Sequence, residues 1–376
     1  MNIGIVGCGI GGAAASLALD KAGIKSTIYE RAPELREAGA GMMLWPNATR
    51  VLRDLGVLDS IASRSGPNET FLVRSAPGDV LMNIALGQFE VPALCTRRAD
   101  LLAGLLDSIP ADRIRLGRTL TKLEQTRSGV RLHFETGETA EHDALIGADG
   151  IRSLVRTQLF GRIDPLYRGY TVWRGIGNYR GDAAPAGVNS ETWGRGHRFG
   201  ILNTGHDRFT WYATANGPEH REDSAEGRQA ELLRMFADWH EPIPQLIAST
   251  PADQILKNPA YDLPPLPRWG SGRITLLGDA AHPCTPNLGQ GGCMALEDAA
   301  VLAKCLASGR TIESGLRRYE SIRRPRTRHV QQRSLLMGTI GQWENRIVVA
   351  GRETVTSLLP AKIFEHNLRR LYAYQT

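Results

Sequence analysis

The N-terminal residues alternate between short apolar runs and one helical pattern. Residues 2–6 (NIGIV) form an apolar run that predicts a short buried strand. A glycine-rich turn follows, and residues 13–23 (AAASLALDKAG) predict a helix that ends at Gly23. Residues 25–30 (KSTIYE) then predict a second strand that ends in an acid. This order of elements is a βαβ unit.

Two later segments have the same design of a strand, a polar turn and a helix. Residues 143–156 (DALIGADGIRSLVR) predict a strand that is closed by Asp149, and residues 273–307 predict a strand that is closed by Asp279. In an open parallel sheet, ligands lie beyond the carboxyl ends of the strands. We therefore expect Glu30, Asp149 and Asp279 to converge on one crevice.

The rest of the pattern predicts a discontinuous second domain. Residues from about 71 to 94 and from about 166 to 215 read as strands and hairpins. The proline-rich residues 261–269 read as the passage back to the first domain. We expect an α/β fold: a Rossmann-like βαβ nucleotide-binding domain, interrupted by a β-sheet substrate domain and followed by C-terminal helices. The expected limits are 1–70, 95–165 and 270–330 for the first domain, 71–94 and 166–269 for the second, and 331–376 for the C-terminal helices.

Length, charge and cysteine content indicate an ordinary soluble protein. The chain has 376 residues, no visible signal peptide, and no apolar run near the length of about 20 residues that crosses a bilayer. Five scattered cysteines argue against an extracellular disulfide scaffold and favour the cytoplasm. The formal net charge is +6, and arginines crowd into residues 317–328. We interpret that run as a solvated helix face and expect no nucleic-acid partner.

The first chemical signal is the glycine spacing of the predicted turn. Gly7, Gly9 and Gly12 match G-x-G-x-x-G, which permits a tight turn, close approach of a pyrophosphate and packing of helix on strand. Glu30 follows Gly9 by about 20 residues, the distance at which a carboxylate reaches the ribose of an adenine dinucleotide. The motif predicts dinucleotide binding and leaves FAD and NAD(P) both open.

A histidine and two cysteines lie close together in residues 273–300. Metal binding by His282, Cys284 and Cys293 is not supported, because their spacing fits no common zinc pattern. A redox disulfide lacks the C-x-x-C spacing. We therefore predict no metal site here and expect a loop that is shaped around another ligand.

Three motifs in order resemble the single-component flavoprotein aromatic hydroxylases, the family of para-hydroxybenzoate and salicylate hydroxylases. The first is the glycine turn. The second is Asp149-Gly150 with Ser153 and Arg156. The third joins residues 278–282 (GDAAH) to residues 289–292 (GQGG). The segment PNLGQGGCMALEDA is most similar to the zeaxanthin epoxidase and FAD-dependent urate hydroxylase branch.

The resemblance implies FAD as the cofactor and a set of residues that hold it. The glycines after Pro286 would let backbone amides approach the flavin, and the helix that starts there would point its N-terminus at the edge that becomes anionic on reduction. Gly39 and Gly41 would lie along the flavin. The implied cofactor-binding residues are Gly7, Gly9, Ile10, Gly11, Gly12, Glu30, Arg31, Met43, Arg98, Leu120, Asp149, Gly150, Gly278, Asp279, Pro286, Gly289, Gln290, Gly291, Gly292 and Cys293.

Substrate-pocket candidates come from the predicted sheet. Arg198, Tyr212 and Trp173 are expected to face the flavin, with Arg174 as a further cation. In the urate hydroxylase branch an arginine of this strand binds substrate. The tyrosine expected about a dozen residues later is out of register, because Thr210 stands there, and this counts against urate as the substrate.

The implied activity is NAD(P)H- and O2-dependent oxygenation of an aromatic or unsaturated small molecule through a flavin C4a-hydroperoxide. NADH or NADPH would bind transiently, because no second glycine-rich βαβ unit is visible. A reductase or desaturase without oxygen transfer stays open, as does a non-catalytic FAD-binding sensor. A halogenase is disfavoured, because the W-x-W-x-I-P signature is absent. Arg174, Arg198 and the basic charge balance suggest an anionic or phenolic ring as substrate, and an apolar polyene or alkaloid would suit the tryptophans equally.

Overall fold

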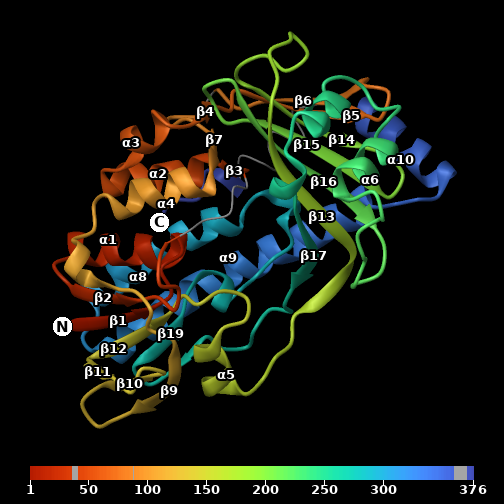
Figure 1. Cartoon of the computed structure of the whole chain (residues 1–376). Coiled ribbons are helices and arrows are strands. Elements are labelled where there is room, and N and C mark those ends of the chain that lie inside the picture. Colours follow the sequence, from red (N-terminus) through yellow and green to blue (C-terminus); the bar gives the residue numbers. More distant parts are fainter. Residues whose placement is uncertain (36–40, 88, 360–370) are drawn as a thin grey trace.

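Two large sheets, two small ones and the helices between and around them make up the described part of the molecule (Figure 1). The computed structural model describes residues 1–35, 41–87, 89–359 and 371–376. Within these residues no helix is both long and apolar enough to cross a membrane. The mixed α/β class expected from the sequence is confirmed.

The first sheet has the strand order β18-β19-β12-β1-β2-β8. Its parallel strands β1 (Asn2–Val6), β2 (Lys25–Tyr29), β12 (Ala144–Gly147) and β19 (Ile274–Leu276) are flanked by β8 (Ile114–Arg115) and the antiparallel β18 (Gly270–Ser271). Helices α1 (Ile10–Lys21) and α8 (Gly291–Ser308) pack against each other over this sheet. Gly23 has a φ of 73°, a left-handed conformation that suits the predicted helix end.

Two small sheets and several short helices complete this lobe. One small sheet has the order β11-β10-β9 and the other β3-β7-β4. Their strands are β9 (Leu120–Gln125), β10 (Val130–Phe134), β11 (Thr139–His142), β3 (Gly41–Leu44), β4 (Gly66–Pro67) and β7 (Leu94–Arg97). The helices are α2 (Pro46–Leu55), α3 (Leu58–Ala62), α4 (Arg98–Leu106) and α5 (Leu154–Phe160).

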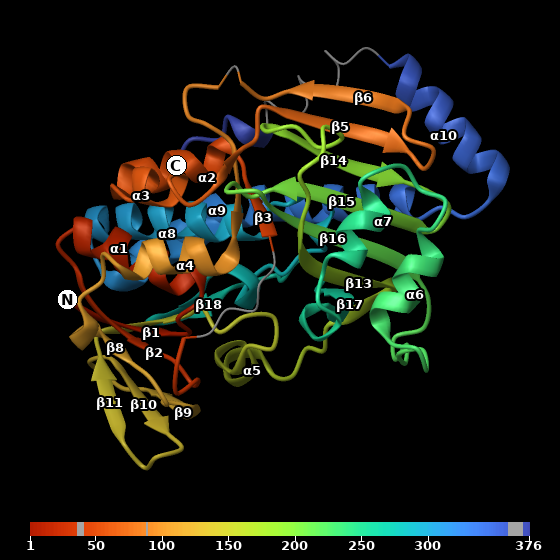
Figure 2. The ribbon, with the colours of Figure 1, turned by 45° about the horizontal axis from the view of Figure 1, so that its top comes forward.

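The second large sheet joins segments that lie far apart in the sequence. Its order is β17-β13-β16-β15-β14-β5-β6, and the neighbours pair antiparallel except β14 with β5. The strands are β5 (Thr70–Ser75), β6 (Val80–Ala85), β13 (Leu166–Asn178), β14 (Val188–Trp193), β15 (His197–Asn203), β16 (Arg208–Asn216) and β17 (Leu256–Asp262). Helices α6 (Arg228–Met235) and α7 (Ile243–Ala248) cover one face (Figure 2). The β-sheet substrate domain expected from the sequence pattern is therefore present.

A long helix connects the two lobes. Helix α9 (Ile312–Gly341) starts at a capping box on Thr311 and continues through Pro325. Near its start Tyr319 donates a hydrogen bond to Leu276 O of the first sheet (3.1 Å), and Gln342 just beyond its end binds Arg198 of the second. The expected boundary at residue 330 lies inside this helix, and within the described residues α10 (Arg346–Leu358) is a separate helix that follows it.

A buried histidine makes stability depend on pH. His142 is 7% exposed and pairs with the Tyr29 hydroxyl at 2.9 Å, and burial lowers its pKa below the usual 6.5. Below about pH 6.5 the unfolded chain takes up a proton that the folded chain does not, so stability falls with falling pH, by up to about 1.4 kcal/mol per pH unit. We expect His142→Gln to flatten urea-unfolding free energies between pH 7.5 and 5.5 relative to the exposed control His220→Gln. Equal pH slopes in both variants would contradict this assignment.

Candidate functional site

The glycine turn between β1 and α1 exposes backbone where a side chain would block it. A Cβ on Gly7, whose φ is 104°, would lie 2.4 Å from Ala148 O, and one on Gly12 would lie 2.0 Å from Gly7 O. A Cβ on Gly9 would meet no atom within 4 Å, so this residue borders open space. No side chain caps the N-terminus of α1. The free amides of this helix start can therefore receive an anion.

Glu30 stands beside this turn, at the carboxyl end of β2. Its carboxylate accepts hydrogen bonds from Cys8 N (2.8 Å) and Ala32 N (3.0 Å). Burial, followed by the charge of Glu30, raises the pKa of the Cys8 thiol to about 12, so this cysteine is no nucleophile. The neighbouring Arg31 is exposed. The backbone thus fixes the acid at the edge of the crevice.

Asp149 follows β12 and caps helix α5. It accepts hydrogen bonds from Ser153 Oγ (2.5 Å), Leu154 N (2.7 Å) and Val155 N (3.1 Å). The buried Arg156 of the same motif donates to Ala280 O at 2.9 Å and so ties this strand end to the next one. Asp149-Gly150 therefore shapes the crevice chiefly by ordering backbone.

Asp279 follows β19 and contrasts with Asp149. It is exposed, yet the protein around it raises the pKa of its carboxyl, an effect that His282 and Arg98 oppose. The side chain is therefore open to solvent although protein atoms surround much of its carboxyl. Arg98 begins α4 and is itself exposed. Because β19, β12, β1 and β2 are neighbours in the sheet, Glu30, Asp149 and Asp279 lie along one edge, as the sequence predicts.

The loop from residue 286 to α8 is built from small residues. Gly289 has a φ of 59°, a Cβ on Gly291 would meet only Cys284 Sγ at 3.8 Å, and one on Gly292 would lie 2.4 Å from Met42 Cε. Helix α8 begins at Gly291 without a side-chain cap, and a Cβ on Gly292 would lie 4.0 Å from Ile10 of α1. The starts of α1 and α8 therefore lie together at one crevice. Pro286 is exposed at the beginning of the loop.

Buried polar groups sit behind this loop. Gln290 is completely buried, and within the described part of the chain its Nε2 has no hydrogen-bond partner. Cys293 is held by Met43 O (3.7 Å) and Gly289 O (3.6 Å), and burial raises the pKa of its thiol to about 12. Burial likewise raises the pKa of Cys284. Both cysteines are therefore thiols that support the loop.

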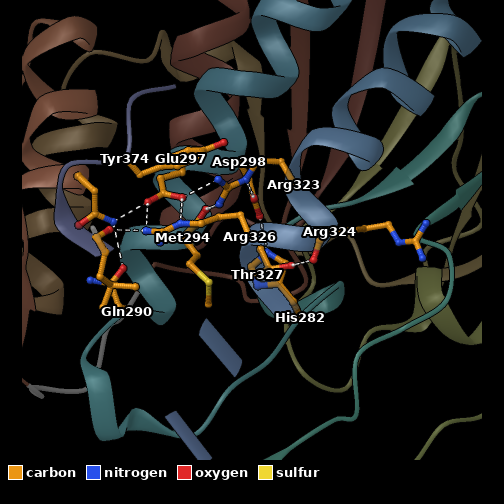
Figure 3. Close-up of polar contacts among 12 residues, drawn as sticks. His282, Gln290, Met294, Glu297, Asp298, Arg323, Arg324, Arg326, Thr327 and Tyr374 are labelled. Atoms are coloured by element: carbon orange, nitrogen blue, oxygen red, sulfur yellow. Dashed lines mark hydrogen bonds and ion pairs between the residues drawn. The ribbon is translucent and has the colours of Figure 1, made fainter. Parts of the chain in front are cut away.

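A buried charge network underlies the loop (Figure 3). Asp298 of α8 accepts from Gly278 N (3.0 Å), pairs with His282 Nε2 (2.5 Å) and receives Arg323 Nε (2.6 Å). Arg323 also pairs with Glu297 at 2.5 Å, and these two carboxylates raise its pKa although burial alone would lower it. The network fixes Gly278, next to the crevice, against α8 and α9.

This network corrects one expectation. The arginine-rich run is not simply a solvated face, because Arg323 is 0% exposed. Asn47 joins the network and donates to Glu297 (2.6 Å) and Gln290 (3.0 Å), while α2 begins at Pro46 after Trp45. The sequence signal for this network is the spacing of three residues between Arg323 and Arg326, which places both arginines on one side of a helix, together with the adjacent acids Glu297 and Asp298.

The sheet's two faces separate the pocket candidates. On β13 Trp173 points to the face that α6 and α7 cover, where it is 0% exposed among Phe199, Trp211 and Phe236. The structure therefore does not bring Trp173 to the crevice, because its side chain packs in the large apolar core under α6 and α7. The opposite face carries Arg198, Tyr212 and Arg174, because side chains alternate along a strand.

Arg198 is a buried cross-link. It is 2% exposed and donates to Glu191 Oε1 (2.9 Å), Gln342 Oε1 (2.9 Å) and Asn287 Oδ1 (2.5 Å). Its three guanidinium nitrogens thereby bind the sheet, the end of α9 and the loop at residue 287. The carboxylate of Glu191 compensates its charge.

Tyr212 lies across β15, where a glycine leaves room for its ring. A Cβ on Gly200, its partner in register, would lie 2.0 Å from Tyr212 Cε1. Burial and the nearby Glu191 raise the pKa of Tyr212 well above its usual value, so the hydroxyl is protonated at neutral pH. Tyr212 thus lies one row from Arg198 on the same face, whereas Thr210, at the position expected for the tyrosine, pairs with Leu202.

Four further cofactor candidates lie in the core, against the second sheet or outside the described residues. Met43 of β3 and Leu120 of β9 are 8% and 6% exposed within the hydrophobic core of the first lobe. Gly41 packs directly on the second sheet, since a Cβ there would overlap the Thr210 hydroxyl. Gly39 lies outside the described residues.

Comparison with known proteins finds one family and relatives along almost the whole chain. The family described as "FAD binding domain" matches residues 1–164 and 262–334. Aurachin C monooxygenase/isomerase of Stigmatella aurantiaca is 37% identical over 98% of this chain and 97% of its own length. FAD-dependent urate hydroxylase of Klebsiella pneumoniae is 33% identical over 86% of both chains. The crystal structure of Klebsiella pneumoniae HpxO with FAD and uric acid has a TM-score of 0.93 at 28% identity, covering 99% and 97%.

Proposed function

This chain belongs to the FAD-binding-domain family of flavin-dependent monooxygenases, and from that premise we propose that it uses NAD(P)H and O2 to hydroxylate or epoxidise an aromatic or unsaturated small molecule. In balance, NAD(P)H, a proton, O2 and substrate give NAD(P)+, water and the oxygenated product. FAD, when bound, would supply the redox chemistry by taking a hydride and activating O2 as a C4a-hydroperoxide.

The observation that carries the proposal is the paired, uncapped helix starts at the carboxyl edge of the first sheet. Amides of α1 beside Gly9 suit a pyrophosphate, and Glu30 suits a ribose. Amides of α8 beside Gly291 suit the anionic edge of a reduced flavin. The residues present therefore fit FAD. We propose residues 1–70, 95–165 and 270–330 as the FAD-binding domain, which contains all the cofactor-binding residues predicted from the sequence.

The chain's own residues have binding and positioning tasks. Arg198 holds the sheet against residue 287 and so sets the width of the pocket. Tyr212 would line the pocket with its ring and with a protonated hydroxyl that pairs with Glu191. We propose residues 71–94 and 166–269 as the substrate domain.

Anaerobic stopped-flow reduction tests the proposal. Purified holoprotein is mixed with NADH or NADPH, with and without aromatic acids, phenols, purines, quinolones and aurachin C, the last because the relative from Stigmatella aurantiaca is named for it. The reduced protein is then mixed with oxygen. We expect one ligand to accelerate flavin bleaching and a transient C4a-adduct absorbance to precede oxidised FAD.

Two results would overturn the proposal. Rapid reduction followed by reoxidation without an adduct would indicate a reductase or desaturase. If neither nucleotide bleaches the flavin with any ligand of the panel, the chain is better described as a non-catalytic FAD-binding protein.

A further inference from the structure

Arg174 is a cation on the crevice side of the second sheet. It lies on β13, directly opposite Tyr212 of β16, and Tyr212 in turn lies opposite Gly200 of β15. Residues of one row point to the same face of a sheet, so Arg174 and Tyr212 face the same space. Trp173, next to it in sequence, points to the other face.

No carboxylate of the described residues pairs with this cation. Within residues 1–35, 41–87, 89–359 and 371–376, the structure gives Arg174 no hydrogen-bond acceptor and no carboxylate partner. The side chain is half-buried, and burial lowers its pKa, as does the nearby charge of Arg98, while the neighbouring Tyr170 acts in the opposite direction. The Arg174 guanidinium is thus partly desolvated and lies near the positive charge of Arg98. Both effects raise the free energy of the charged side chain unless a further group compensates it.

Arg198 provides the contrast on the same face. All three of its guanidinium nitrogens donate to protein oxygens, and Glu191 at 2.9 Å balances its charge. A bound anion would gain little from Arg198, since Glu191 would repel it. Of these two arginines, Arg174 is the one whose charge is available.

We propose that Arg174 is the anion-binding residue of the crevice and pairs there with the negative charge of a bound small molecule. The inference rests on the proposed function in assuming that FAD occupies the crevice. Two bound molecules bring such a charge: the carboxylate or phenolate of the substrate, and the reduced flavin. The experiment has one arm for each.

The substrate arm compares two probes of equal shape and different charge. 4-Hydroxybenzoate and 4-hydroxybenzamide are titrated into oxidised holoprotein, and binding is followed by the change in flavin absorbance. We expect the natural protein to prefer the acid at least tenfold, and Arg174→Gln to reduce this preference to about twofold or less. Arg174→Lys, which keeps the charge, should retain most of the preference.

The flavin arm measures the two-electron midpoint potential without ligand. If Arg174 stabilises reduced FAD, Arg174→Gln lowers the potential by about 30 mV or more, which corresponds to a tenfold change in the reduction equilibrium. Arg174→Lys should restore most of the potential. Arg180→Gln is the matched control in both arms, because Arg180 is exposed just beyond the end of β13.

Either positive arm supports the proposal and identifies the source of the anion. Unchanged acid preference together with unchanged potential in Arg174→Gln would overturn it. Since removal of an uncompensated cation should not destabilise the fold, the variant should keep its FAD and unfolding midpoint; Arg174→Met is a second neutral variant. Neither arm involves turnover. The proposal for Arg174 can therefore fail although oxygenation is observed, and it can hold although no oxygenation is observed.

Discussion

Asp298→Ala is expected to lower the free energy of unfolding by about 3–5 kcal/mol, because it removes one member of a buried charge network. Asp298 is 0% exposed, and the loss leaves Arg323, His282 and Gly278 N without their shared acceptor. Since Gly278 precedes Asp279 at the crevice, FAD affinity should fall as well. Urea unfolding and FAD titration measure the two effects.

A surface ion pair is the control for this prediction. Asp107 pairs with Arg64 at 3.0 Å, but both side chains are more than 40% exposed (57% and 41%). Exposed pairs contribute about 0–1 kcal/mol, so Asp107→Ala should change stability little. Equal destabilisation by the two variants would show that the buried network does not stabilise the fold as described.

Gly12→Val should abolish retention of FAD. A Cβ on Gly12 would lie 2.0 Å from Gly7 O and 3.4 Å from Ile5 Cγ2, so the larger side chain must displace the turn from α1. We expect a purified variant with less than about a tenth of the natural flavin content, since a displacement of even 1 Å spoils such a site. The flavin-to-protein absorbance ratio measures this directly.

Gly351 offers the matched control in another helix. A Cβ on Gly351 of α10 would meet no atom within 4 Å, so Gly351→Ala should leave flavin content unchanged. A Gly12→Val protein that keeps its full flavin content would refute the role given to this turn.

The first sheet and its crevice were predictable because their signals are local. Gly7 and Gly12 report a steric requirement of the backbone, and the acids at the ends of β2, β12 and β19 follow from where parallel strands end. In the structure the Asp149 carboxylate caps helix α5, a local contact that was not predicted from the sequence.

The second sheet and the buried charges were less predictable, because their signals are non-local. Which face of β13 is covered depends on α6 and α7, more than 50 residues later, and so Trp173 was assigned to the wrong side. Arg198 was found by resemblance, but its neutralisation by Glu191 depends on strand register. From the sequence alone Arg323 is predicted to be a surface residue. Only the packing of α8 against α9 shows that Glu297 and Asp298 pair with it in the interior.

The central claim is that this chain transfers one atom of O2 to a small molecule. The most direct test is turnover under 18O2, using NAD(P)H and the ligand that most accelerates flavin reduction, with mass spectrometry of the product. The account predicts one 18O atom in each product molecule and one product for each NAD(P)H consumed. Unlabelled product, or consumption of NAD(P)H that yields only hydrogen peroxide, would contradict it.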